Sequence, residues 1–370
     1  MRNTFYFFNS FRDNSPMFSH VNRVFCSIDL LIQKTLVFSF LFFLIISDIN
    51  AGQPQAIPVV TPEVAQSLSL LQKKKAKTNS YWKGKKIVWF GTSIPAGVVN
   101  AGESGGNGSY PERIGQILGA TVYNESVGAS RVRGGNHAAA TENDPFGWSG
   151  MSTTGILFSL SLSSKEKQTF IDEWDTKWSG IVSDPTHLMD HLDKKKIQTF
   201  LDSSWDIKLT KYLSGGSCGP VDLYVFDHGF NEAVLPGMFN DMLDKPEDPT
   251  DRTYFLGAMA FLFKKILDDN YKARILIIGH YMNAETQLGI KDGIDKCCEA
   301  QERIAADWGF PIIKTWEHMR LSNNMIQVNG SEIPVFRAYF PDGVHPASDK
   351  TGYALKYYAE ILAPLIENIR

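Results

Sequence analysis

The chain has 370 residues, of which 43% are hydrophobic, 12% aromatic and 21% charged. This composition is that of a globular protein long enough to bury a sizeable core, in one large domain or two ordinary ones. A formal net charge of −3, with no long block of one sign, argues against a nucleic-acid partner and against a polybasic membrane-binding patch.

The beginning of the chain is typical of an export segment. The apolar run 35–47 follows several basic residues and precedes a small residue, Ala51. Its 13 residues suit the apolar region of a signal peptide and are fewer than the roughly 20 that span a bilayer. We expect residues 1–51 to direct export, with cleavage after Ala51 and no stable membrane span afterwards. Met17 as the true start and an uncleaved N-terminal anchor stay open as alternatives.

Residues 52–84 are rich in Pro, Gln, Lys and Ser, and predict a linker into a domain over 85–370. In that domain, apolar runs typical of strands covered on both faces alternate with helical patterns. The alternation predicts an α/β fold, a flavodoxin-like three-layer α/β/α sandwich around a central parallel sheet. The expected strands lie in 86–91, 120–128, 221–229, 273–281 and 310–316, and the expected helices are Tyr110 to Leu118, Thr253 to Asp268, Gly293 to Trp308 and Ser348 to Ile369.

Residues 136–216 interrupt this alternation, because they contain no convincing strand. Two amphipathic stretches, 163–178 and 186–205, predict helices in this region. A helical insertion between two strands either forms a cap or pocket wall, or is a second helical layer with a purely structural role. The sequence leaves both interpretations open.

The cysteines and histidines give little indication of a disulfide framework or a metal. Loss of Cys26 with the export segment would leave Cys218, Cys297 and Cys298, an odd number. A bridge from Cys218 to one of the neighbouring pair stays open. Since no CxxC, HExxH or His-rich cluster is present, the sequence predicts no metal and no other cofactor.

Polar clusters follow three of the expected strands and precede the last helix. Because ligands of open α/β sheets bind beyond the carboxyl ends of the strands, these clusters should meet at one edge. Together they hold the parts that acyl transfer requires: a hydroxyl, an imidazole, a carboxylate and donors for an oxyanion. The clusters are "GTS" (91–93), "NESVGAS" (124–130), "HGFNE" (228–232) and "PDGVHPASD" (341–349).

Each cluster contains a residue suited to one of these roles. The Ser93 hydroxyl needs a base in order to attack at neutral pH, and His345 would supply it. Asp342 is close enough in sequence to fix the tautomer of that imidazole. The absence of a side chain at Gly128 lets a backbone N–H approach an oxyanion, and Asn231 can present an amide donor to the same point.

The blocks "GTSI", "NESVGAS", "HGFNE" and "DGVHP", in this order, resemble those of the SGNH (GDSL-type) hydrolases. The resemblance covers the predicted domain apart from the helical insertion. It implies a serine esterase with the SGNH hydrolase fold, in which Ser93 is the nucleophile. The backbone N–H of Ser93 would form the oxyanion hole with Gly128 and Asn231. His345 would be the base and Asp342 its partner.

Two positions depart from the family pattern. Thr92 stands where the family usually has Asp, so a negative charge is lost. Glu232 stands where the family usually has Asp after the asparagine, which keeps the charge on a longer side chain. Neither change removes a catalytic group, and both bear on rate and substrate preference.

A second serine motif, "GGSCG" at 215–219, matches the G-x-S-x-G pattern of α/β-hydrolases. That motif needs a strand before the serine and a helix after it. Ser217 instead follows a predicted helix and precedes a predicted strand. A glycine-rich connection explains the motif better than a catalytic role.

Four further residues are candidates for substrate binding, each with a structural alternative. Arg131 and Arg133 could bind a carboxylate or a polar sugar, or could be solvated or salt-bridged. Trp148 could stack on a sugar ring, although a loop tryptophan is more often packed. His228 could line the pocket, or could be a hydrogen-bonded residue at a strand end.

These observations predict an exported serine esterase that removes small acyl groups, above all acetyl, from carbohydrates or from small-molecule esters. A lipid acyl hydrolase or thioesterase on the same fold is one alternative, since the same catalytic residues serve those reactions. A catalytically weak glycan-binding protein is another. The sequence does not distinguish hydrolysis from acyl transfer to an alcohol, and it does not indicate an oligomeric state.

Overall fold

A computed structural model of the chain describes residues 80–99, 108–182, 192–233, 240–279, 291–319, 321–347 and 354–369. The expected export segment, with Met17 and the cleavage position after Ala51, lies outside these ranges. So do residues 52–79 of the expected linker and the start of the second amphipathic stretch, 186–191.

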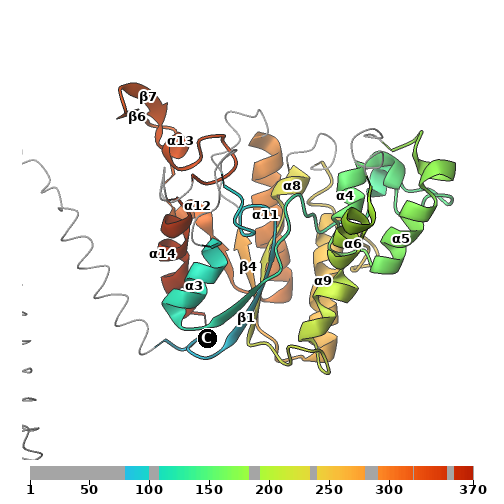
Figure 1. The fold of residues 1–370 in the computed structure, drawn as a ribbon, viewed down its shortest axis with the longest axis horizontal. Helices are drawn as coiled ribbons and strands as arrows, with labels where there is room; N and C mark the ends of the chain where they lie inside the picture. Colours follow the sequence, from blue (N-terminus) through green and yellow to red (C-terminus); the bar gives the residue numbers. More distant parts are fainter. Residues whose placement is uncertain are drawn as a thin grey trace, which may run out of the picture. The chain divides into compact units, whose positions relative to one another are not determined.

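A five-stranded parallel sheet forms the centre of the described chain (Figure 1). Its strand order, β2-β1-β3-β4-β5, is the doubly wound order in which ligands bind where the order reverses. That position lies between β1 and β3, where Gly91 pairs with Asp227. The strands are β1 (Lys86–Gly91), β2 (Thr121–Asn124), β3 (Leu223–Asp227), β4 (Ile275–Gly279) and β5 (Ile312–Lys314).

Helices cover both faces of this sheet, as Figure 1 shows. On one face Trp89 packs edge-on against Tyr110 of α3, which stacks on Tyr358 of α14. On the other face Phe226 packs against Phe263 of α9. This arrangement confirms the predicted three-layer α/β/α sandwich. The long helices of the two layers are α3 (Tyr110–Leu118), α14 (Ala354–Glu367), α9 (Phe255–Asp269) and α11 (Lys291–Trp308).

Residues at both ends of helix α3 fix where the helix begins and ends. The Ser109 side chain accepts from the amide of Glu112, whose carboxylate accepts from the Ser109 amide. This capping box satisfies donors at the first turn, where Pro111 needs no partner. Gly119 ends the helix with a φ of 69°, which favours glycine.

The helical insertion has a hydrophobic core of its own. Trp148 packs edge-on against Phe170 and Trp178 within this core. The insertion lies against α9, since Trp205 contacts Phe261 at a ring separation of 5.6 Å. A self-contained core favours the interpretation as a second helical layer. Its helices are η1 (His137–Ala139), η2 (Trp148–Gly150), α4 (Thr153–Leu157), α5 (Ser164–Asp172), η3 (Trp174–Trp178), α6 (Lys194–Asp202), α7 (Trp205–Lys208) and η5 (Thr210–Tyr212).

Two further features differ from the expected organisation. Trp82, within the expected linker, is fully buried and donates from Nε1 to the carbonyl of Ile366 at 2.9 Å. An antiparallel hairpin, which we did not expect, is closed by Asn329 and Gly330, both at positive φ. The hairpin strands are β6 (Met325–Val328) and β7 (Ser331–Pro334), followed directly by the short helix α13 (Val335–Tyr339). Two other short helices, α8 (Phe230–Ala233) and α12 (Thr315–His318), follow β3 and β5.

Candidate active site

Ser93 lies in a tight turn at the carboxyl end of β1. The turn is closed by a hydrogen bond from the amide of Ala96 to the carbonyl of Thr92, at 3.1 Å. Gly91 is required before it, because a Cβ there would lie 2.4 Å from Cγ of Pro95. The chain can therefore reverse immediately beyond the sheet, which leaves Ser93 at the edge where ligands of this fold bind.

A chain of hydrogen bonds joins the three residues predicted to be catalytic. Ser93 Oγ lies 3.1 Å from Nε2 of His345, although the two residues are 252 positions apart. His345 Nδ1 lies 2.9 Å from Oδ2 of Asp342. These distances suit a nucleophile, its base and the group that orients the base. The side chains of His345 and Asp342 are 26% and 28% exposed, so a substrate can reach them.

The Asp342 carboxylate is held in one orientation by the backbone. Its Oδ1 accepts from the amides of Val344 and His345 at 2.8 and 2.7 Å. Partial burial alone would raise the pKa of Asp342, but these two amides and the imidazole lower it below its usual value. An ionised carboxylate only accepts, so Nδ1 of His345 carries the proton and Nε2 can accept one from Ser93.

The residues predicted to form the oxyanion hole with Ser93 lie in the adjacent loop and in helix α8. A Cβ built on Gly128 would lie 4.0 Å from Cβ of Ser93, so the backbone of Gly128 runs directly beside the serine. Asn231 of α8 donates from Nδ2 to the carbonyl of Ser130 at 2.7 Å. Because an amide nitrogen carries two hydrogens, Asn231 can donate the second to a bound substrate.

Ala129, the residue after Gly128, has a left-handed backbone conformation with a φ of 61°. A residue with a Cβ pays roughly 1–2 kcal/mol for this conformation. Such conformations persist only where the surroundings impose them, and they are common at functional sites. The contacts that hold this loop are therefore part of the site.

Thr92 and Glu232, the two departures from the family pattern, are both buried. Thr92 is 3% exposed, and the hydrogen bonds of the catalytic residues are made without an acid at this position. Glu232 is fully buried, and its Oε1 accepts from the amide of Val132 at 2.6 Å. Burial raises the pKa of Glu232 despite this bond. The side chain of Glu232, which is longer than the usual Asp, thus holds the backbone of the residues that follow Ser130.

The two arginines considered for substrate binding are buried in the protein. Arg131 is 6% exposed, and burial lowers its pKa to about 10 although Glu232 opposes the shift. Arg133 is fully buried, and its guanidinium makes a bidentate ion pair with Asp241 at 2.7 and 2.8 Å. It also donates to the carbonyl of Thr253. Burial favours the structural alternative for Arg131, and burial together with these contacts favours it for Arg133.

Replacing Arg133 by methionine should lower the free energy of unfolding by about 3–5 kcal/mol, because the Asp241 carboxylate loses its partner in a largely buried place. Urea unfolding measures the change. The double variant Arg133→Met/Asp241→Leu should recover part of the loss, since no charge is then left without a partner. A loss below about 1 kcal/mol in the single variant would contradict the structural role.

Trp148 and His228 are also buried, which favours the structural alternatives: a packed tryptophan and a hydrogen-bonded histidine at a strand end. Trp148 is 5% exposed, stacks on Phe146 and donates from Nε1 to the carbonyl of Gly134 at 2.9 Å. His228 is 3% exposed, and its Nε2 lies 3.1 Å from Oγ of Ser130. Burial lowers the pKa of His228 to about 3, so this imidazole is neutral at physiological pH.

Sequence reasoning missed Asp227, which ends β3 beside Gly91. The Tyr110 hydroxyl donates to Asp227 Oδ2, and Trp89 Nε1 lies 3.4 Å from the same oxygen. Desolvation raises the pKa of Asp227 to about 6, although both hydrogen bonds oppose the shift. An acidic residue within an otherwise apolar strand, "LYVFD", was the available signal.

The folded protein therefore binds the Asp227 proton more tightly than the unfolded chain, in which the pKa is 3.8. As pH rises from 3.8 to about 6, this group lowers the free energy of unfolding. Relative to Asp227→Asn, wild-type stability should fall by about 3 kcal/mol over that interval, as measured by urea unfolding.

A carboxylate with the opposite shift is the control for this prediction. Hydrogen bonds from Thr250 lower the pKa of Asp248. Relative to Asp248→Asn, wild-type stability should rise with pH. If the difference in the free energy of unfolding between wild type and Asp227→Asn stays constant with pH, the raised pKa of Asp227 is excluded.

The competing serine lies outside this arrangement. Ser217 is exposed and stands between Gly215 and Gly219, both at positive φ, in the turn before β3.

Cys218, Cys297 and Cys298 are free thiols. In the described ranges no three or more His, Cys, Asp or Glu side chains are grouped so as to hold a metal ion. No helix in the same ranges has the length and apolar character that a membrane span requires.

The chain is similar to several solved structures. A lipase/acylhydrolase from Enterococcus faecalis is 11% identical, with 77% of this chain and 96% of that chain covered and a TM-score of 0.37. A variant of an acetyl xylan esterase from Geobacillus stearothermophilus is 13% identical, with coverages of 77% and 94% and a TM-score of 0.35. An active-site variant of a family two carbohydrate esterase from Clostridium thermocellum is 13% identical, with coverages of 77% and 63% and a TM-score of 0.36.

No protein-family model and no curated protein matches the chain. The function of this chain therefore has to be inferred from its own residues. Three sequence blocks separated by up to 252 positions bring a serine, an imidazole, a carboxylate and a loop glycine to one edge of the sheet.

Proposed function

We propose that this chain is a serine esterase of the SGNH type that removes small acyl groups, above all acetyl, from carbohydrate esters. The observation that carries the proposal is the hydrogen-bonded chain from Ser93 through His345 to Asp342. A serine with an imidazole base within reach and a carboxylate that orients the imidazole is an activated nucleophile.

The reaction begins when Nε2 of His345 takes the Ser93 proton as Oγ attacks the ester carbonyl. The tetrahedral oxyanion accepts hydrogen bonds from the amides of Ser93 and Gly128 and from the Asn231 side chain. His345 then gives its proton to the leaving alcohol, which leaves an acyl-enzyme on Ser93. Water repeats the sequence, with His345 again taking and returning a proton, and releases the acid.

The choice of a small acyl group has support from the insertion. Three of its largest apolar side chains, Trp148, Phe170 and Trp178, are turned into its own core. These side chains are consequently not available as an apolar wall for a long acyl chain. The sequence resemblance and the apolar segment near the start of the chain favour an exported enzyme with an extracellular or periplasmic ester as substrate.

The test is a series of chromogenic esters with acetyl, butyryl and octanoyl groups, together with acetate release from acetylated polysaccharides. We expect kcat/KM to be highest for the acetyl ester, and acetate to be released from at least one polysaccharide. A preference for octanoyl esters would favour the lipid acyl hydrolase. Binding to a polysaccharide without turnover of any ester would favour the glycan-binding protein.

Export is a separate part of the proposal. Its residues, 1–51, lie outside the described ranges. N-terminal sequencing of protein recovered outside the cytoplasm should begin at Gly52, as expected for cleavage after Ala51. Recovery of the uncleaved chain in the membrane fraction would favour the anchor.

A further inference from the structure

We propose that Glu125 is a positioning residue, which ties the end of the helical insertion to the loop 125–130 and so holds the Gly128 amide beside Ser93. The inference rests on the proposed function, because it assigns that amide to the oxyanion. It gives the insertion a role in the reaction, which its self-contained core alone does not suggest.

The Glu125 side chain receives several donors from the last two turns of the insertion. Lys208 Nζ, at the end of α7, lies 2.9 Å from Oε2 and also donates to the Glu125 carbonyl at 2.7 Å. Lys211 and the Tyr212 hydroxyl, both in η5, contact Oε1. The side chains of Glu125 and Lys208 are each 13% exposed, so water competes little for this ion pair.

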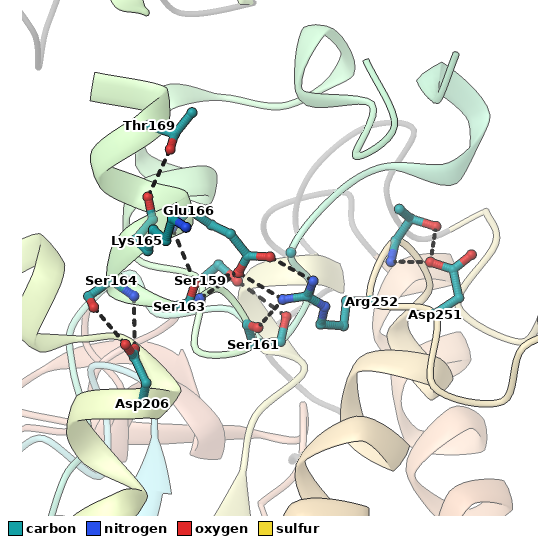
Figure 2. A network of polar contacts seen from close by, with 12 residues as sticks. Ser159, Ser161, Ser163, Ser164, Lys165, Glu166, Thr169, Asp206, Asp251 and Arg252 are labelled. Atoms are coloured by element: carbon teal, nitrogen blue, oxygen red, sulfur yellow. Dashed lines mark hydrogen bonds and ion pairs between the residues drawn. The ribbon is translucent and has the colours of Figure 1, made fainter. Parts of the chain in front are cut away.

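Helix α7 is itself anchored to the rest of the insertion. Asp206 accepts from the Ser164 amide at 2.8 Å and from its hydroxyl at 2.6 Å, which joins α7 to the first turn of α5 (Figure 2). Lys208, two residues after Asp206, therefore approaches Glu125 from a fixed helix. The insertion can transmit its position to the loop through this side chain.

The other side of the same segment is attached to the end of β1 and to the turn that carries Ser93. The amides of Glu125 and Val127 donate to the carbonyls of Trp89 and Gly91 at 2.8 and 3.0 Å. Asn124, the preceding residue, donates from Nδ2 to the carbonyl of Pro95 at 2.6 Å. Glu125 thus lies between the insertion and the turn that carries Ser93.

The strained residue of this loop explains why such an attachment is needed. Ala129 keeps its φ of 61° only while the chain on both sides is held. The Glu125 contacts hold the loop before Gly128, and the hydrogen bond from Asn231 to the Ser130 carbonyl holds it afterwards. Without the first attachment, Gly128 can relax away from Ser93 together with Ala129.

The test replaces Glu125 by glutamine, which keeps the length of the side chain and removes its charge. With a chromogenic acetyl ester, kcat should fall about 10- to 100-fold, since displacement of a catalytic group by about 1 Å can cost two orders of magnitude. KM should change less than about threefold, because the oxyanion donor acts in the transition state. Lys208→Arg, which keeps the charge and the donors, should lose less activity than Lys208→Met.

A matched ion pair elsewhere in the insertion provides the control. Glu166 of α5 pairs with Arg252 at 2.8 Å in the network of Figure 2, and that pair attaches the insertion on another side. Hydrogen bonds from Arg252 lower the pKa of Glu166 against the effect of burial, as Lys208 does for Glu125. Glu166→Gln should leave kcat within about twofold of wild type while it loosens the same insertion.

The outcomes separate this inference from the proposed function. If Ser93→Ala is inactive and Glu125→Gln lowers kcat with KM nearly unchanged, both stand. If Ser93→Ala is inactive but Glu125→Gln keeps wild-type kcat, or matches Glu166→Gln, the positioning role is overturned and the esterase remains. Activity that survives in Ser93→Ala overturns the proposed function. If Glu125→Gln fails to fold, Lys211→Met takes its place, because it removes only the contact between Lys211 and Glu125. Its kcat and KM are then judged by the same criteria.

Discussion

Replacement of Ser93 by alanine should lower kcat for a chromogenic acetyl ester by about 10⁶, to the residual rate that binding alone supports. The hydroxyl that His345 would deprotonate is then absent, and no acyl-enzyme can form. The change removes the contact between Ser93 Oγ and Nε2 of His345. The turn itself is closed by backbone hydrogen bonds and should survive the change. Steady-state hydrolysis and thermal unfolding of the same preparations measure both parts of this expectation.

The matched control for this prediction is Ser217→Ala. Ser217 belongs to the competing "GGSCG" motif and is exposed in the turn before β3. Its replacement should leave kcat within about twofold of wild type. If Ser217→Ala is the inactive variant and Ser93→Ala the active one, the nucleophile has been assigned to the wrong motif.

Replacement of Asp342 by asparagine should lower kcat by about 10⁴ with little effect on folding. The amides of Val344 and His345 both donate to Oδ1, so an asparagine would keep its oxygen there. Its NH₂ group would then face Nδ1 of His345. The imidazole would have to accept at Nδ1 and carry its proton on Nε2, where it could not take the Ser93 proton.

Steady-state kinetics and the midpoint of thermal unfolding test this prediction together. Asp248→Asn is the control, because that carboxylate also accepts a backbone amide, from Thr250 at 2.9 Å, in a turn outside the candidate site. We expect Asp248→Asn to retain full activity. A loss of less than about tenfold in Asp342→Asn would mean that the carboxylate does not select the tautomer.

Much of the fold was accessible from local patterns. The runs around 86–91 and 223–227 predict buried parallel strands, because both faces of such strands are covered and little alternation remains. Helix α3 has the predicted bounds, since Ser109, Glu112 and Gly119 specify its two ends locally. Helices α9 and α11 begin within two residues of the expected positions.

The hairpin over 325–334 was missed although a local signal for it exists. Its Asn329-Gly330 pair is the dipeptide that two-residue hairpin turns favour, and apolar residues flank it. The turn of this hairpin is therefore encoded locally in the sequence.

Local patterns predicted the candidate catalytic groups of this protein: a serine after a strand, a glycine loop, an amide and a histidine three residues after an aspartate. Which of the nearby polar residues can meet a substrate was decided only by packing. Arg133 closely follows the glycine block and Trp148 lies in the helical insertion, yet both are enclosed. Glu125 is joined to Lys208 across 83 positions, and no local pattern indicates such a contact. Side-chain burial and ion pairing depend on neighbours distant in sequence, and these come together only when the chain has folded.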